Sequence, residues 1–129
     1  LEASRGSGVR IAIGGRSMGG RVASVVAVDA SCDALALFAY PLHPPGRPEQ
    51  ARTDHFDRIP CPVLLCSGTR DAFGSPDRLA SAATALPDHT IHLLDGADHG
   101  FSTPKASGRT REQIWEEASE AFLRWITVL

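Results

Sequence analysis

The stretch that decides the fold runs Val9-Arg10-Ile11-Ala12-Ile13-Gly14-Gly15-Arg16-Ser17-Met18-Gly19-Gly20. Residues 9–13 are mostly apolar and β-branched, which predicts a buried strand, and residues 18–30 predict a buried helix. Between them, Gly15-x-Ser17-x-Gly19 matches the G-x-S-x-G pattern of a nucleophile elbow. In this motif a sharp strand-to-helix turn strains the serine and projects its hydroxyl above the sheet. We therefore predict a nucleophile at Ser17, with an ordinary turn serine as the alternative.

The same glycines do not fit a nucleotide-binding loop. A P-loop needs a lysine directly after its glycines, and the only lysine of the chain is Lys105. A dinucleotide fingerprint needs a second glycine at the position that Arg16 occupies. The sequence therefore argues against nucleotide binding.

The composition is that of one small domain, residues 1–129. The chain is 43% hydrophobic and 22% charged, with a formal net charge of −2. Neither nucleic acid nor a membrane is therefore expected as a partner, and no apolar run approaches the roughly 20 residues of a membrane span. Three cysteines in a chain with enough apolar residues for a core favour reduced thiols and a cytoplasmic location.

Strands and helices alternate along the rest of the sequence. We predict strands at residues 34–40, 62–67 and 90–94, and helices at residues 49–56, 76–86 and from Thr110 onward. Ser75-Pro76 offers an N-cap followed by a first-turn proline, and Thr110-x-x-Gln113 is a capping box. The alternation predicts parallel strands joined by right-handed crossovers, which is a doubly wound α/β sheet.

Three chemically suited residues follow the ends of predicted strands. Ser17 follows the first strand, Asp71 the third and His99 the fourth. Ligands of open α/β sheets bind beyond the carboxyl ends of the strands, so we expect these side chains at one edge. A serine hydroxyl needs an imidazole to take its proton, and the imidazole needs a carboxylate to hold its tautomer. The sequence therefore predicts a Ser-His-Asp triad.

Two other carboxylates compete with Asp71 for the acid role. Asp98 adjoins His99, but adjacent side chains diverge, so Asp98 is poorly placed to orient the ring. Asp95 lies at the end of the preceding strand and is expected to close a turn. Asp71 itself has the alternative of capping the turn that follows it. We expect Asp71 to be the acid.

The remaining histidines are less informative, with one exception. His92 lies inside a predicted strand and is expected to be a satisfied or half-buried core residue, and His89 is expected in a turn. His43 lies in a proline-rich loop that leaves the end of a strand. It is therefore a candidate for lining the site.

Four collinear motifs are spread along the chain between Gly14 and Phe101. They are Gly14-Gly-Arg-Ser-Met-Gly-Gly-Arg21, Tyr40-Pro-Leu-His-Pro-Pro-Gly46, Gly68-Thr-Arg-Asp-Ala-Phe-Gly74 and Gly96-Ala-Asp-His-Gly-Phe101. Together they resemble the α/β-hydrolase superfamily in its dienelactone-hydrolase-like region. They are most similar to a sub-family of bacterial hydrolases, a testis-expressed hydrolase-like protein and a subunit of a histone acetyltransferase complex.

The resemblance implies roles for these residues in a serine esterase. Ser17 would be the nucleophile, Asp71 the acid and His99 the base, with the Met18 N–H as one oxyanion donor. His43 and Phe101 are candidates for contacting the substrate. The expected substrate is an ester, thioester or lactone with a small acyl group, and no metal or cofactor is expected. A hydrolase-like interaction module with a vestigial triad is the alternative.

The chain departs from the family pattern in its number of strands. The family core has eight strands, and the four predicted here resemble the last four, so we expect the C-terminal half of the fold. The loop that supplies the second oxyanion N–H lies in the missing half. The strand at residues 9–13 would then have an open edge. We expect either an N-terminal half or a second copy of the chain to pair there.

Overall fold

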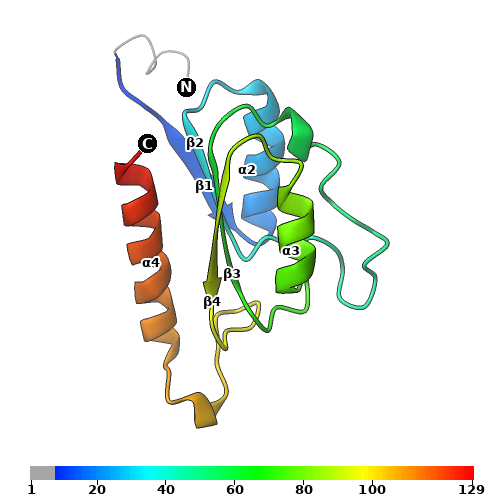
Figure 1. The fold of residues 1–129 in the computed structure, drawn as a ribbon, viewed down its shortest axis with the longest axis vertical. Coiled ribbons are helices and arrows are strands. Elements are labelled where there is room, and N and C mark those ends of the chain that lie inside the picture. The colour runs from blue at the N-terminus through cyan, green and yellow to red at the C-terminus, as the bar shows by residue number, and fades with distance from the viewer. Residues whose placement is uncertain (1–7) are drawn as a thin grey trace.

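The computed structural model describes residues 8–129 and contains one sheet of four parallel strands (Figure 1). The spatial order is β1-β2-β3-β4, the same as the order along the chain. The strands are β1 (Ala12–Arg16), β2 (Ala34–Phe38), β3 (Val63–Gly68) and β4 (His89–Leu94). All three pairings are parallel, as predicted.

Helices cover both faces of this sheet. One face carries α2 and α3, and the other carries α4, as Figure 1 shows. Their bounds are α2 (Met18–Asp29), α3 (Pro76–Ala83) and α4 (Arg111–Thr127), and two short 3-10 turns are η1 (Phe56–Arg58) and η2 (Lys105–Ser107). The sheet is therefore doubly wound, as the alternation of apolar segments predicted.

Two apolar cores follow from this arrangement, one on each face of the sheet. The core under α2 and α3 includes Leu35, Leu65 and Leu79. The core under α4 includes Leu64 and Ile114. Successive strand residues point to opposite faces, and helices cover both faces. β3 is therefore buried along its whole length, as a central parallel strand should be.

Both predicted helix starts are present. The Ser75 hydroxyl accepts a hydrogen bond from the Arg78 N–H at 3.3 Å, and Pro76 occupies the first helical turn. At the start of α4, the Thr110 hydroxyl accepts from the Gln113 N–H, and the Gln113 side chain accepts from the Thr110 N–H. Local side-chain chemistry therefore determines where these two helices begin.

The first strand differs from its prediction. β1 begins at Ala12 rather than at residue 9, because its pairing with β2 begins where Ala12 meets Ala34. It also continues through both glycines to Arg16. A β-carbon on Gly14 would lie 2.4 Å from the Ala36 carbonyl oxygen, so this strand approaches β2 closely only because it has no side chain there.

Other boundaries also differ. β2 ends at Phe38 instead of residue 40, because Ala39 turns into the left-handed region at φ 51°. The predicted helix at residues 49–56 does not form, and a short 3-10 turn follows at Phe56–Arg58. α3 ends at Ala83, three residues early. His89 is the first residue of β4 rather than part of a turn.

Two cysteine thiols, distant in sequence, face each other at the amino-terminal ends of β2 and β3. The sulfur atoms of Cys32 and Cys61 are 3.6 Å apart and buried. Burial and the neighbouring Cys32 thiol raise the pKa of Cys61 to about 12, and burial raises the pKa of Cys66 to about 12. No sequence pattern predicted that Cys32 and Cys61 would meet.

An apolar surface remains at the β1 side of the molecule. Within residues 8–129, β1 pairs only with β2, so its outer edge has no strand partner. The adjacent helix α2 exposes Met18, Val22 and Val25, with 71%, 58% and 57% of their surfaces accessible. The unpaired edge agrees with the open edge predicted for the first strand. In the described part of the chain, no helix has the length and apolarity that crossing a membrane requires.

Candidate active site

The Ser17 turn joins β1 to α2 in a strained conformation. Ser17 has φ 53° and ψ −122°, a region that side chains with a β-carbon rarely occupy. Its N–H donates to the Phe38 carbonyl oxygen at 2.8 Å, which ties the turn to the end of β2. Although Ser17 is the N-cap residue of α2, its hydroxyl makes no capping bond. The hydroxyl is therefore free to bond elsewhere.

The structure brings together the three residues that the sequence analysis selected. The Ser17 Oγ lies 2.8 Å from Nε2 of His99. The other ring nitrogen, Nδ1, lies 2.9 Å from Oδ2 of Asp71. The Asp71 side chain is 1% exposed, whereas the His99 side chain is 21% exposed. The result is a polar chain from a buried carboxylate to a hydroxyl at the sheet edge.

The directions of these hydrogen bonds follow from the chemistry of the carboxylate. An ionised Asp71 carboxylate can only accept, so Nδ1 of His99 carries the proton that it donates to Oδ2. The lone pair of Nε2 then accepts from the Ser17 hydroxyl. This tautomer leaves the imidazole able to take the serine proton.

Asp71 is held by its own loop. Its second oxygen, Oδ1, accepts a hydrogen bond from the Phe73 N–H at 2.7 Å. The Phe73 ring lies against the His99 imidazole, with ring centroids 4.1 Å apart. Phe73 belongs to the third motif, Gly68–Gly74, but no sequence pattern predicted that its ring would lie against His99.

The competing carboxylate, Asp98, serves the loop that carries His99. Its Oδ1 accepts hydrogen bonds from the N–H groups of Gly100 at 3.0 Å and Ser102 at 2.9 Å. Arg16 donates to the His99 carbonyl oxygen at 3.2 Å. Asp98 thus closes the turn around His99, and the ring itself bonds to Asp71.

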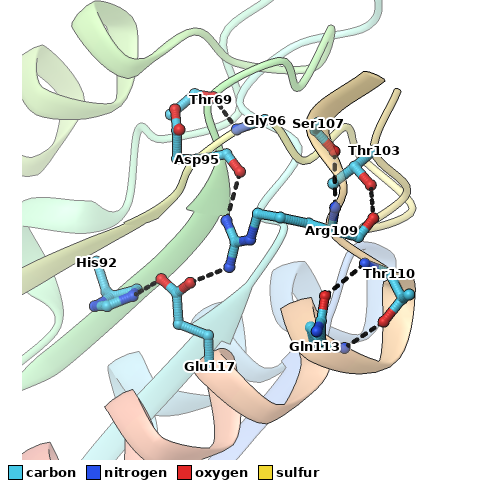
Figure 2. A network of polar contacts seen from close by, with 10 residues as sticks. All are labelled: Thr69, His92, Asp95, Gly96, Thr103, Ser107, Arg109, Thr110, Gln113 and Glu117. Atoms are coloured by element: carbon cyan, nitrogen blue, oxygen red, sulfur yellow. Dashed lines mark hydrogen bonds and ion pairs between the residues drawn. The ribbon is translucent and has the colours of Figure 1, made fainter. Parts of the chain in front are cut away.

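A second polar network joins the two ends of the loop between β4 and α4 to each other, to Thr69 after β3 and to α4, as Figure 2 shows. At the start of the loop, the Gly96 N–H donates to the Thr69 hydroxyl at 2.8 Å. Arg109 donates to the Asp95 carbonyl oxygen at 2.7 Å and pairs with Glu117 of α4. The loop is thereby fixed at both of its ends.

Glu117 also pairs with the edge strand. Its Oε2 lies 2.6 Å from Nε2 of His92, which confirms that His92 is a satisfied, half-buried residue. Burial by itself would raise the pKa of Glu117. The hydrogen bonds from His92 and Arg109 and their charges outweigh burial and lower that pKa.

Two further predicted site residues are Met18, at the start of α2, and His43, in the loop after β2. Met18 is the first residue of α2, so its N–H has no acceptor four residues earlier within the helix. His43 is buried, and its Nδ1 lies 2.7 Å from the Pro44 carbonyl oxygen. It lines a cavity of about 210 Å³ between its loop and α3.

Phe101 is a core residue, which corrects the expectation that it contacts substrate. Its side chain is fully buried beneath α4 and lies 4.7 Å from the Trp115 ring, centroid to centroid. The Arg16 guanidinium lies over the Phe101 ring, 5.7 Å from the ring centroid. Phe101 has φ 64°, in the left-handed region, and its fully buried side chain offers no open surface to a ligand.

A second serine–histidine contact joins Ser24 of α2 to His55. Ser24 is fully buried, and its Oγ lies 2.7 Å from Nε2 of His55. Burial, with the charges of Arg58 and Arg21, lowers the pKa of His55. Burial also raises the pKa of the neighbouring Tyr40. This contact joins the 41–60 loop to α2, and no sequence pattern predicted a role for His55.

Comparisons with known proteins agree with this fold. The sequence model of a family described as "Alpha/beta hydrolase domain" matches residues 1–127. No curated protein matches the chain at a significant level.

Solved structures give the same picture. The chain is similar to an alpha-beta serine hydrolase homologue from Coxiella burnetii, with 18% identity, a TM-score of 0.63, and 92% of this chain and 50% of that chain covered. It is also similar to a "Putative Dienelactone Hydrolase" from Klebsiella pneumoniae, with 22% identity, a TM-score of 0.69, and 90% and 51% covered. A puromycin-hydrolyzing peptidase from Mycobacterium tuberculosis matches with 23% identity, a TM-score of 0.61, and 91% and 22% covered.

These similarities concern the fold, and the chain spans about a fifth to about half of the length of these three proteins. The four parallel strands, the helices on both faces and the family match together classify the molecule. The chain belongs to the alpha/beta hydrolase domain family.

Proposed function

We propose that this chain carries the reacting residues of a serine hydrolase that cleaves an ester, thioester or lactone with a small acyl group. One observation carries the proposal: the strained Ser17 presents its Oγ 2.8 Å from Nε2 of His99, whose Nδ1 lies 2.9 Å from the buried Asp71. The hydrolase names of the structural neighbours support the reaction class.

In the proposed first step, Ser17 Oγ attacks the carbonyl carbon of the substrate while His99 Nε2 takes the hydroxyl proton. The carbonyl π electrons move onto its oxygen, toward which Met18 would donate its N–H. The imidazolium that forms is stabilised by the Asp71 carboxylate. His99 then gives the proton to the leaving oxygen or sulfur, and the acyl group remains on Ser17.

The second step returns the enzyme to its starting state. Water attacks the acyl carbon while His99 takes a proton from the water. The proton then passes to Ser17 Oγ as the acyl–oxygen bond breaks, and the carboxylic acid leaves. These steps use no metal or cofactor. We also propose that the chain belongs to the dienelactone-hydrolase-like sub-family.

The rate depends on the oxyanion donors. Removing one donor from a serine hydrolase site costs about 10²–10³ in rate. The family resemblance assigns the second donor to a loop that precedes β1 in the whole fold. We therefore expect full activity only when an N-terminal half accompanies these residues.

Labelling with a fluorophosphonate probe tests the proposal on the full-length protein. We expect Ser17 to be labelled, and Ser17→Ala and His99→Ala to lose the label while keeping the fold. Ser24→Ala is a matched control, because Ser24 also contacts a histidine nitrogen but is buried. A wild-type protein that resists the probe, or a His99→Ala variant that hydrolyses esters at the wild-type rate, would contradict the proposal.

The second candidate function is an interaction module without catalysis. The open β1 edge and the exposed valines of α2 favour it, since unpaired strand edges and apolar patches bind other chains. The partner would be an N-terminal half or a second copy of this chain. Failure of the probe to label Ser17, together with self-association, would support this candidate.

A further inference from the structure

The aromatic ring nearest to the proposed base belongs to Phe73. The centroids of the Phe73 and His99 rings lie 4.1 Å apart, and their planes meet at 30°. Aromatic pairs in proteins usually lie 4.5–7 Å apart, so this contact is close. A small angle between the planes means that one face of the imidazole rests on a face of the phenyl ring.

The same residue is tied to the proposed acid. The Phe73 N–H donates to Oδ1 of Asp71 at 2.7 Å, which leaves Oδ2 for Nδ1 of His99. The Phe73 carbonyl oxygen accepts from the His43 N–H at 3.3 Å. Main-chain bonds on both sides therefore fix Phe73, and through it the relative positions of the carboxylate and the imidazole.

The ring contact distinguishes the two protonation states of the imidazole. The face of a phenyl ring carries negative charge density, so it attracts a cation more strongly than a neutral ring. His99 is neutral before it takes the serine proton and cationic afterwards. A half-buried Phe73 also keeps water from one face of the imidazole, which strengthens this attraction.

We propose that Phe73 is a positioning residue of this site, whose ring holds the His99 imidazole in line and favours its protonated form during the reaction. This inference rests on the proposed function. It assigns to Phe73 a role that an ordinary apolar contact would not have, because the role depends on the aromatic face.

Charged groups around His99 also influence its protonation. Asp71 bonds to its ring, and Arg16 donates to its carbonyl oxygen. Asp98 is engaged with N–H groups of its own loop, and Arg111 of α4 donates to the Gly100 carbonyl oxygen at 2.9 Å. All of these groups remain when only the Phe73 ring is changed.

The experiment compares Phe73→Leu, Phe73→Tyr and wild type in the full-length protein, with a p-nitrophenyl ester as substrate. Leucine keeps apolar bulk but removes the aromatic face, so kcat should fall about 2–5-fold with little change in KM. The midpoint of the pH profile of kcat/KM should move to lower pH by about half a unit. Phe73→Tyr keeps an aromatic face, so its kcat and the midpoint of its pH profile should match those of wild type.

A second measurement does not depend on turnover. In the Ser17→Ala background, the His99 ring resonances are followed by NMR as the pH changes, with and without Phe73→Leu. The midpoint should again move to lower pH by about half a unit on loss of the ring. Phe122→Leu removes a half-buried ring from α4 and should leave the His99 titration unchanged.

The outcomes separate this inference from the proposed function. If wild type neither turns over nor is labelled, the proposed function fails, and the NMR titration still decides the ring contact. If wild type is active and Phe73→Leu leaves both midpoints unchanged, the inference is overturned. It is also overturned if Phe73→Tyr behaves like Phe73→Leu. Should Phe73→Leu fail to fold, Phe73→Met replaces it in both arms.

Discussion

Gly15 lies so close to Gly19 that a β-carbon on Gly15 would come within 2.5 Å of the Gly19 carbonyl carbon. The contact joins the end of β1 to the first turn of α2, on either side of Ser17. No real β-carbon approaches a backbone atom this closely, so an added methyl group must move the backbone. The strained turn at Ser17 thus depends on a residue without a side chain.

Gly15→Ala should therefore disrupt the Ser17 turn. We expect a loss of about 1–3 kcal/mol in the free energy of unfolding, as overpacked sites show, and a loss of fluorophosphonate labelling. Gly19→Ala is the matched control for stability, because a β-carbon there meets nothing within 4 Å. Urea unfolding measures both variants, and equal stability of the two would contradict the prediction.

The two aspartates near His99 should differ in their effect on ester hydrolysis. Asp71→Asn cannot hold the required tautomer of the imidazole, a change that costs about 10⁴ in kcat in the serine-protease example. Asp98→Asn keeps an Oδ1 that can accept from Gly100 and Ser102, so its cost should be far smaller. Measured kcat values in the reverse order would transfer the acid role to Asp98.

The Glu117 network should make stability depend on pH. Because the pKa of Glu117 is lowered in the folded state, its contribution is present above the pKa of the unfolded chain. It is lost as the pH falls through the folded pKa. We expect Glu117→Gln to lower the free energy of unfolding at pH 7 by about 1 kcal/mol or less, and this difference from wild type to vanish in acid.

Urea unfolding at a series of pH values provides the measurement. Glu116→Gln removes a neighbouring exposed charge of α4 and serves as the control. A pH-independent difference between Glu117→Gln and wild type would show that the carboxylate acts by packing rather than by charge.

The open side of the molecule should make the isolated segment, residues 1–129, self-associate. The unpaired edge of β1 and the exposed Val22 and Val25 of α2 provide strand pairing and apolar contact. Light scattering should report a dimer or larger species. A double change of Val22 and Val25 to Lys should reduce it, and Ala80→Lys on α3 should not. A monodisperse monomer with a cooperative melt would argue against this surface.

Some features of this protein were determined by the sequence alone, because they depend on residues only a few positions apart. The Ser17 turn needs small residues at its flanks, and Ser75 and Thr110 cap helices that begin directly after them. Apolar segments of strand and helix length alternate, which limits the sheet to parallel pairing. The residues beyond each strand end could therefore be assigned to one edge before the structure was known.

The tertiary structure decided what depends on side-chain direction across long stretches of chain. Ser17 and His99 are 82 positions apart, and only the assembled sheet brings their side chains to 2.8 Å. In the folded loop the Asp98 carboxylate bonds to the Gly100 N–H, and the His99 ring bonds to Asp71 instead. Packing alone placed the Phe73 ring against the imidazole, since no short sequence pattern records which way a loop side chain points.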